Sequence, residues 1–136
     1  MATAEPNQAE LLWVAELLGE LHAEGIALDA SAVSGYFDRR LAEWITAMPE
    51  VRGDANIHIN RVGAAVGELL VRSTGLRWVV YSDEHGAELA VHGQPGDILL
   101  FPMNAVAKRW TGDADGTIAQ FLALAVAAIE RARAVT

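Results

Sequence analysis

The sequence predicts an α+β fold in which helices surround a small antiparallel sheet. Segments near both ends of the chain repeat apolar residues at the three- and four-residue spacing of amphipathic helices. Between them, Leu76 to Trp110 contains three short apolar runs separated by glycine-containing turns, which is typical of a three-stranded antiparallel meander. We therefore expect three N-terminal helices, the three-stranded antiparallel β-meander, a short helix and a long C-terminal helix. All belong to a single domain over residues 1–136.

The first two helices are predicted from apolar stripes and from residues that favour helix ends. The first helix runs from Asn7 to Glu24 and ends before Gly25, because a left-handed cap suits a residue without Cβ. The second begins at Ser31, whose hydroxyl we expect to cap it, and stops at Pro49.

The third helix covers roughly Ile57 to Thr74 and is expected to be capped by Asp54 or Asn56. It holds Gly63 and Gly67 in its interior, and each glycine costs about 1 kcal/mol relative to alanine. Some gain must offset that cost. We expect a neighbouring helix or strand to approach closely there, and the alternative is a ligand that approaches the helix backbone.

The meander is predicted from apolar runs at Leu76 to Tyr81, Leu89 to Val91 and Ile98 to Phe101. In the first run the residues of both faces are largely apolar, so we expect helices to cover the sheet on both sides. Pro102 ends the last strand because proline cannot donate to a ladder. A short helix follows, and a longer one begins near Ile118.

Composition excludes several classes of function. The chain has 18 acidic and 10 basic residues, a net charge of −8, and this field repels the phosphates of nucleic acids. It has no cysteine, which excludes disulfide scaffolds, thiolate zinc sites and cysteine nucleophiles. No apolar run approaches the roughly 20 residues of a membrane span, and glutamates stand where a signal peptide carries Lys or Arg. We therefore expect a cytoplasmic protein without nucleic-acid or membrane partners.

No motif for catalysis or for metal or cofactor binding is found. His58, His85 and His92 lack the spacing of metal-ligand pairs, and the calcium-like run Asp113 to Gly116 has its glycine one residue too early. The segment Ser82 to His85 holds a serine, two carboxylates and a histidine, but neighbouring residues of a turn point in different directions. We predict no catalytic residue, no metal and no cofactor.

Two charged pairs remain that packing alone does not explain. The acidic pair Asp83-Glu84 lies in the first turn of the meander, and Lys108-Arg109 lies beside Trp110 in the short helix. These pairs either meet each other or meet a partner. Arg and Trp are enriched among interface hot spots, so we predict a binding surface here; alternatively, Trp110 packs inward and the cations stay solvated or paired. The predicted binding residues are Trp78, Asp83, Glu84, Lys108, Arg109 and Trp110.

A family resemblance rests on motifs in the C-terminal half of the chain. These are Gly67-Glu68, Leu76-Arg-Trp78-Val-Val, Asp83-Glu-His-Gly86, Phe101-Pro102 and Lys108-Arg109. The pattern resembles a family of small, uncharacterised bacterial domains of unknown function that share a GE…W…DE.G…FP…KR arrangement. The resemblance implies an α+β domain from a bacterial cytoplasmic protein, without an established activity. It singles out Glu68, Trp78, Asp83, Phe101, Lys108 and Arg109.

Two hypotheses of function follow from these observations. The first is a non-enzymatic binding or interaction module, for example an immunity-type or regulatory protein whose acidic surface covers a basic protein partner. The second is a small enzyme or ligand-binding domain with a pocket around Trp78, Asp83, Lys108 and Arg109. A third alternative is a homo-oligomer formed through an uncovered edge of the meander.

Overall fold

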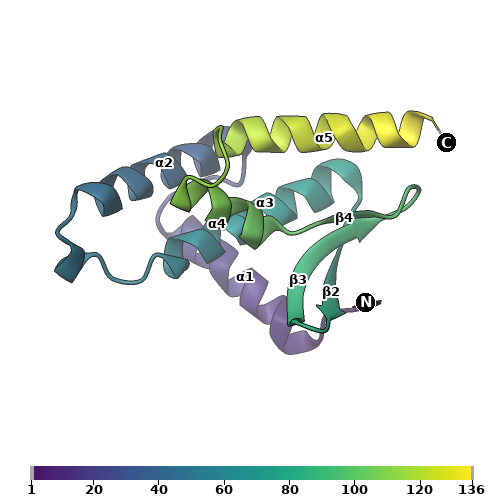
Figure 1. Ribbon diagram of the computed structural model, residues 1–136, viewed down its shortest axis with the longest axis horizontal. Coiled ribbons are helices and arrows are strands. Elements are labelled where there is room, and N and C mark those ends of the chain that lie inside the picture. Colours follow the sequence, from purple (N-terminus) through teal and green to yellow (C-terminus); the bar gives the residue numbers. More distant parts are fainter. Residues whose placement is uncertain (1, 136) are drawn as a thin grey trace.

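The computed structural model describes residues 2–135 and has the α+β architecture that the sequence predicts (Figure 1). Within these residues, the strands form one antiparallel sheet with the strand order β1-β2-β3-β4. The elements in chain order are β1 (Ala2–Ala4), α1 (Gln8–Ala23), α2 (Ala30–Thr46), the 3-10 turn η1 (Pro49–Val51), α3 (Asn56–Thr74), β2 (Arg77–Asp83), β3 (Gly86–Gly93), β4 (Ile98–Leu100), α4 (Pro102–Thr111) and α5 (Ile118–Ala134). In this part of the chain, no helix is both long and apolar enough to cross a membrane.

The sheet has one strand more than the predicted meander. Strand β1 precedes the helices and pairs antiparallel with β2, with Thr3 opposite Tyr81. The run Ala-Thr-Ala is too short and too weakly apolar to be recognised as a strand, and its hydrogen-bonding partner lies far away in the sequence. The edge of β2 is thereby covered, and β1 and β4 become the outer strands.

The first three helices begin with different capping arrangements, and that of α1 was not predicted. Asn7 forms a reciprocal capping box with Glu10 at the start of α1, with hydrogen bonds of 2.7 and 2.8 Å. The predicted cap of α2 is wrong, because Ser31 is already helical and the Asp29 carboxylate accepts from the backbone of Ala32 at 2.7 Å. In α3 the N-cap position is Ala55, which makes no side-chain hydrogen bond.

Helix α3 lies at the centre of the fold and packs against α1, α2, α4, α5, β2 and β3. A Cβ atom at Gly63 would meet the backbone of Met103 in α4, and a Cβ atom at Gly67 would overlap the ring of Trp78 in β2. The expectation of close approach at the two glycines is therefore confirmed. A helix contacts one of them and a strand the other, at the cost in helix propensity that glycine brings.

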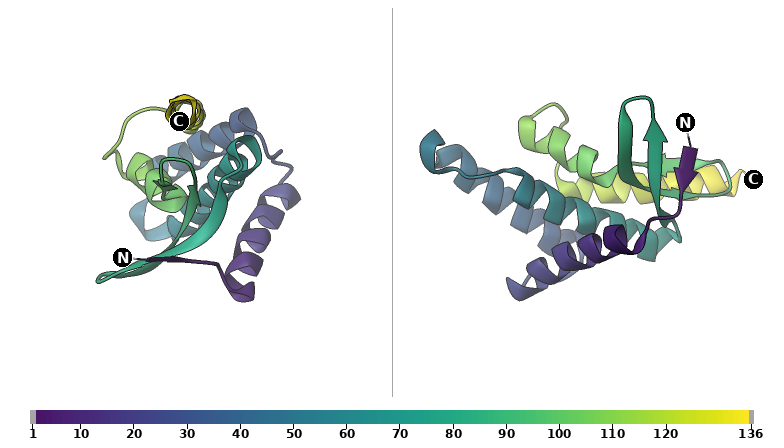
Figure 2. Two further views of the ribbon diagram at one scale, coloured as in Figure 1. Left: turned by 90° about the vertical axis from the view of Figure 1, so that its right-hand side faces the viewer. Right: turned by 90° about the horizontal axis from the view of Figure 1, so that it is seen from below.

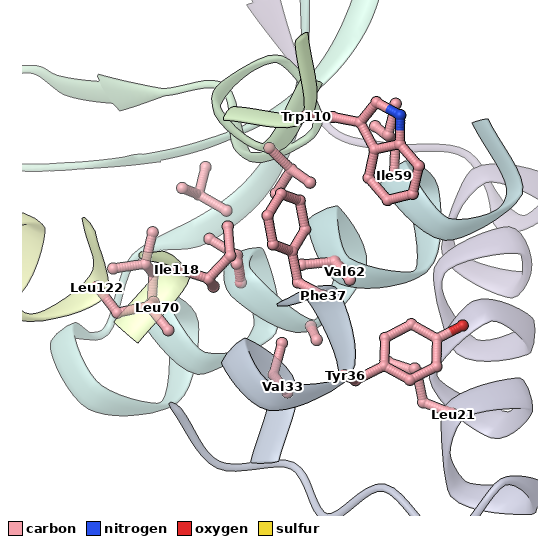
Figure 3. Packing of buried hydrophobic residues seen from close by; sticks show 14 of the residues in the cluster. Leu21, Val33, Tyr36, Phe37, Ile59, Val62, Leu70, Trp110, Ile118 and Leu122 are labelled. Carbon is pink, nitrogen blue, oxygen red and sulfur yellow. The ribbon is translucent and has the colours of Figure 1, made fainter. Parts of the chain in front are cut away.

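The main core forms where α2, α3 and α5 meet. Figure 3 shows side chains of all three helices in one cluster, with the ring of Phe37 directed toward Trp110 of α4. The cluster includes Val33 and Phe37 of α2, Val62 and Leu70 of α3, and Ile118 and Leu122 of α5.

The helices contact the sheet on one face, not on both as we expected. Trp78 and Leu89 lie on the face that packs against α1 and α3. Figure 2 shows these two helices on the same side of the β2–β3 ribbon. The opposite face carries Val79 and Tyr81, and here Tyr81 packs edge-on against Phe101 at 5.3 Å between ring centroids. An aromatic pair thus covers part of the face that we had assigned to a helix.

Replacing Gly67 with alanine tests the close approach of Trp78. The new methyl group would displace the indole ring, so we expect Gly67→Ala to lower the free energy of unfolding by about 1–3 kcal/mol despite the better helix propensity of alanine. Urea unfolding measures the change.

Gly19→Ala is the matched control, because Gly19 lies inside α1 and a Cβ atom there would meet nothing within 4 Å. We expect this substitution to leave stability unchanged or to raise it by up to about 1 kcal/mol. Equal effects of the two substitutions would contradict the packing argument.

Candidate functional site

Trp78, the first of the predicted binding residues, is occupied by contacts within the fold. Its half-buried indole ring fills the space that Gly67 leaves, and its Nε1 donates to Glu68 Oε1 at 3.2 Å. The other carboxylate oxygen of Glu68 accepts from Arg72 Nε at 3.0 Å. These contacts join β2 to α3, which is a structural role for Trp78.

The acidic pair lies in the tight turn between β2 and β3. The Oδ1 atom of Asp83 accepts from the backbone nitrogen of His85 at 2.8 Å, so Asp83 stabilises the turn. Glu84 is exposed, and its Oε1 lies 3.5 Å from His85 Nε2. Asp83 is thus explained by the turn, and Glu84 is available for other contacts.

The basic pair does not meet the acidic pair, so the alternative of a contact between them is wrong. Arg109 Nη1 donates to the carbonyl of Ala105 at 3.0 Å, and the guanidinium carbon lies 4.6 Å from the centre of the Phe121 ring. Lys108 is exposed and forms no ion pair with a described residue. Figure 1 shows the β2–β3 turn and the end of α4 on different sides of the molecule.

The structure therefore does not gather Trp78, Asp83, Lys108 and Arg109 around one pocket. Trp110, the last predicted binding residue, is buried and packs inward, as the alternative interpretation proposed. Its ring packs edge-on against Phe37 at 5.7 Å and lies parallel to the ring of His58 at 5.9 Å. A role in binding for the exposed side chains of Glu84 and Lys108 stays a prediction.

A polar network that the sequence analysis missed lies between α1, α2 and α3. The hydroxyl of Tyr36, a residue only 1% exposed, lies 3.2 Å from His58 Nδ1 and also 3.2 Å from Arg61 Nη1. Because the guanidinium of Arg61 only donates, the Tyr36 oxygen accepts from it, and in the tautomer of His58 that leaves Nδ1 unprotonated the Tyr36 hydroxyl donates to that nitrogen. His58 Nδ1 is then an acceptor, which requires a neutral imidazole.

Ion pairs extend this network to the surface. Arg61 binds Glu20 at 2.8 Å and Glu24 at 2.7 Å, and Arg40 bridges Glu24 and Glu43. Glu20 and Arg61 are 41 positions apart, so no local spacing in the sequence could have identified the pair. The arginines thereby join α1 to both α2 and α3.

The environment of His58 supports its neutral state. Burial lowers the pKa of the imidazole, and the charges of Arg40 and Arg61 lower it further, against the opposite influence of Glu24 and Glu43. The arrangement offers little for catalysis, because the Tyr36 hydroxyl is buried and the carboxylates of the network are paired with arginines. Among residues 2–135, no three His, Cys, Asp or Glu side chains gather as a metal site.

A second feature that the sequence analysis missed is a group of exposed apolar residues, which we call the tip. It consists of Ile45, Met48, Val51 and Ile57, which are 58%, 68%, 73% and 50% exposed. They come from the end of α2, from η1 and its flanks, and from the start of α3. Figure 1 shows this segment projecting at the end of the molecule opposite the sheet.

Arg52 lies beneath the tip and holds its backbone. Its Nε donates to the carbonyl of Ala47 and its Nη2 to the carbonyl of Ile45, both at 3.2 Å. Its guanidinium carbon lies 4.4 Å from the centre of the Trp44 ring. Arg52 thereby satisfies carbonyls at the end of α2 that lack helical partners. At the tip the arginine is half-buried whereas the four apolar side chains are exposed, the reverse of the usual distribution.

The neutral state of His58 predicts how stability depends on pH. Folding lowers the pKa of His58 below its usual value of 6.5, so the unfolded chain binds protons more readily. The stabilising contribution is fully present above that value and is lost as the pH falls through the lower pKa of the folded state. We expect urea unfolding at about pH 5.5 to give a lower free energy than at about pH 7.5.

His58→Asn keeps an acceptor for the Tyr36 hydroxyl and removes the titrating ring, so we expect a smaller difference between the two pH values. His85→Asn is the matched control, because the His85 side chain is 83% exposed. If wild type and His58→Asn lose the same stability on acidification, the assignment to His58 is incorrect.

Comparison with known proteins identifies one family. Residues 40–121, more than half of the chain, match the family described as "Domain of unknown function (DUF3806)". No curated protein and no solved structure matches the chain. The matched segment contains the tip and the Gly67, Glu68 and Trp78 contact. It confirms the resemblance to an uncharacterised domain family, over a longer stretch than the C-terminal half. The protein therefore belongs to the DUF3806 family of domains of unknown function.

Proposed function

We propose that this protein is a non-enzymatic binding module that acts by contact with another protein, and that the tip is its contact surface. The observation that carries the proposal is the gathering of Ile45, Met48, Val51 and Ile57 on one projecting segment, each at least half exposed. Single exposed apolar residues are normal on soluble proteins. Several of them on one short projecting segment favour an interaction site.

Hydrophobic burial gives the tip its capacity to bind. Fully burying a side chain such as Ile, Met or Val contributes about 1.5–3 kcal/mol, and in the isolated protein much of this contribution remains unused. A partner that covers the tip would gain it. Met48 and Val51, at 68% and 73% exposure, have the most surface left to bury and are the best candidates for the centre of the contact.

The contacts of Arg52 support the same proposal. Its hydrogen bonds to the carbonyls of Ala47 and Ile45 fix the backbone of the tip before a partner arrives. A preformed surface loses less conformational entropy on binding than a disordered loop. An immunity-type or regulatory protein in the cytoplasm works in this way, because it covers its partner and does not transform it.

Site-specific photo-crosslinking tests the proposal in cells of the native host. A photoreactive amino acid at position 48 is expected to give one discrete protein adduct. Leu124 is the matched control position, because it is an apolar residue with 71% exposure on α5. Absence of an adduct at position 48, or the same adducts at both positions, would count against the proposal.

Competition connects the adduct to the tip surface. An excess of the purified wild-type protein is expected to suppress adduct formation at position 48. The same excess of Met48→Asp/Val51→Asp should not suppress it, because charge at these positions prevents burial. Both residues are largely exposed, so thermal unfolding of the variant should match that of wild type.

A further inference from the structure

We infer that the protein surface contacted by the tip is apolar at its centre and bordered by lysine and arginine side chains. This inference rests on the proposed function and adds the chemistry of the partner. It follows from the charges that surround the tip and from the direction in which each of them points.

The outward-facing charge around the tip is negative. Glu50 and Asp54 are exposed and form no ion pair with another described residue. The side chain of Glu43 is 63% exposed and pairs with Arg40, which also binds Glu24.

The cations of this segment do not balance these carboxylates. Arg52 is the only lysine or arginine between Leu41 and Ile57. Its guanidinium is half-buried and is held by hydrogen bonds to the carbonyls of Ala47 and Ile45 and by the ring of Trp44. The tip therefore presents apolar side chains close in sequence to carboxylates that form no ion pair with a described residue.

The combination of exposed apolar side chains and carboxylates determines which kind of protein surface fits the tip. A surface that covers Met48 and Val51 removes water from the adjacent Glu50 and Asp54, and a carboxylate that loses water must find a donor or a cation. Lysine or arginine at the rim of the partner supplies both. Attraction between the carboxylates of the tip and basic residues of the partner also raises the rate of association. Because salt screens this attraction, the interaction should weaken as ionic strength rises.

The same charges oppose the other occupants of an apolar surface. Two copies joined tip to tip would bring Glu50 and Asp54 close to the same residues of the second copy. Anionic lipid and nucleic acid carry the same sign as the chain, whose net charge is −8. A protein with a basic rim is the occupant that complements both the apolar and the charged part of the surface.

Two variants with equal changes in net charge test the inference. In Glu50→Lys/Asp54→Asn, the asparagine keeps the side-chain oxygen that accepts from the backbone of Asn56 at 2.9 Å. The matched control, Glu16→Lys/Glu88→Gln, makes the same charge change at exposed positions on α1 and β3, away from the tip and from the predicted binding residues. The readout is the yield of the protein adduct formed from a photoreactive residue at position 48.

At low ionic strength the yield is expected to fall roughly tenfold for the tip variant. It should stay near the wild-type value for the control variant Glu16→Lys/Glu88→Gln. Added salt should lower the wild-type yield. Equal losses in both variants would assign the effect to overall charge and overturn the inference. An unchanged yield in the tip variant would overturn it as well, and so would an adduct with a second copy, a lipid or a nucleic acid.

The outcome separates this inference from the proposed function. If the wild-type protein gives no adduct at position 48, the proposed function itself fails. If the wild-type adduct forms and persists in the tip variant, the tip binds a protein and only the basic rim is wrong.

Discussion

The contact of Gly67 and Glu68 with Trp78 fixes the position of α3 against the sheet, and the rest of the fold depends on it. Glycine lets the indole ring lie directly on the helix, and the neighbouring Glu68 accepts from the indole nitrogen at 3.2 Å. One turn earlier, Gly63 admits the backbone of α4 at Met103. A helix with larger residues at the two glycines could not hold a strand and another helix this close. The cost in helix propensity is therefore offset by packing on α3.

The same contact gives a physical explanation for the residues on which the family resemblance rests. Gly67, Glu68 and Trp78 form one packing unit, and Phe101 packs edge-on against Tyr81 on the other face of the sheet. Arg109 lies over the ring of Phe121 and so joins α4 to α5. Most positions that the resemblance singled out thus hold the architecture together. A pattern made of packing contacts reflects the fold, and the tip residues of the proposed contact surface lie outside this pattern.

Sequence reasoning predicted the elements that local spacing determines and missed those that depend on distant residues. The helices, the meander and the close approach at Gly63 and Gly67 follow from periodicity and from the cost of helical glycine. Strand β1 was not predicted, because its hydrogen-bonding partner β2 lies far along the chain. The network of Tyr36, His58 and Arg61 was missed for the same reason, since Tyr36 of α2 contacts His58 and Arg61 of α3. Arg52 was overlooked because an arginine in a polar loop is usually solvated, whereas here it binds the end of α2.

The ion pairs between α1 and α3 mean that the family boundaries do not mark a unit that folds alone. The matched segment begins at residue 40, after α1, yet Arg61 inside it depends on Glu20 and Glu24 of α1. Trp78 likewise packs against a cluster that contains Val14 and Leu17. The segment also stops at residue 121, before the core residues Leu122 and Ile129 of α5. A fragment cut at these limits would expose its own interior and leave arginine charges without carboxylates. Recombinant work on such domains therefore needs the flanking helices as part of the folding unit.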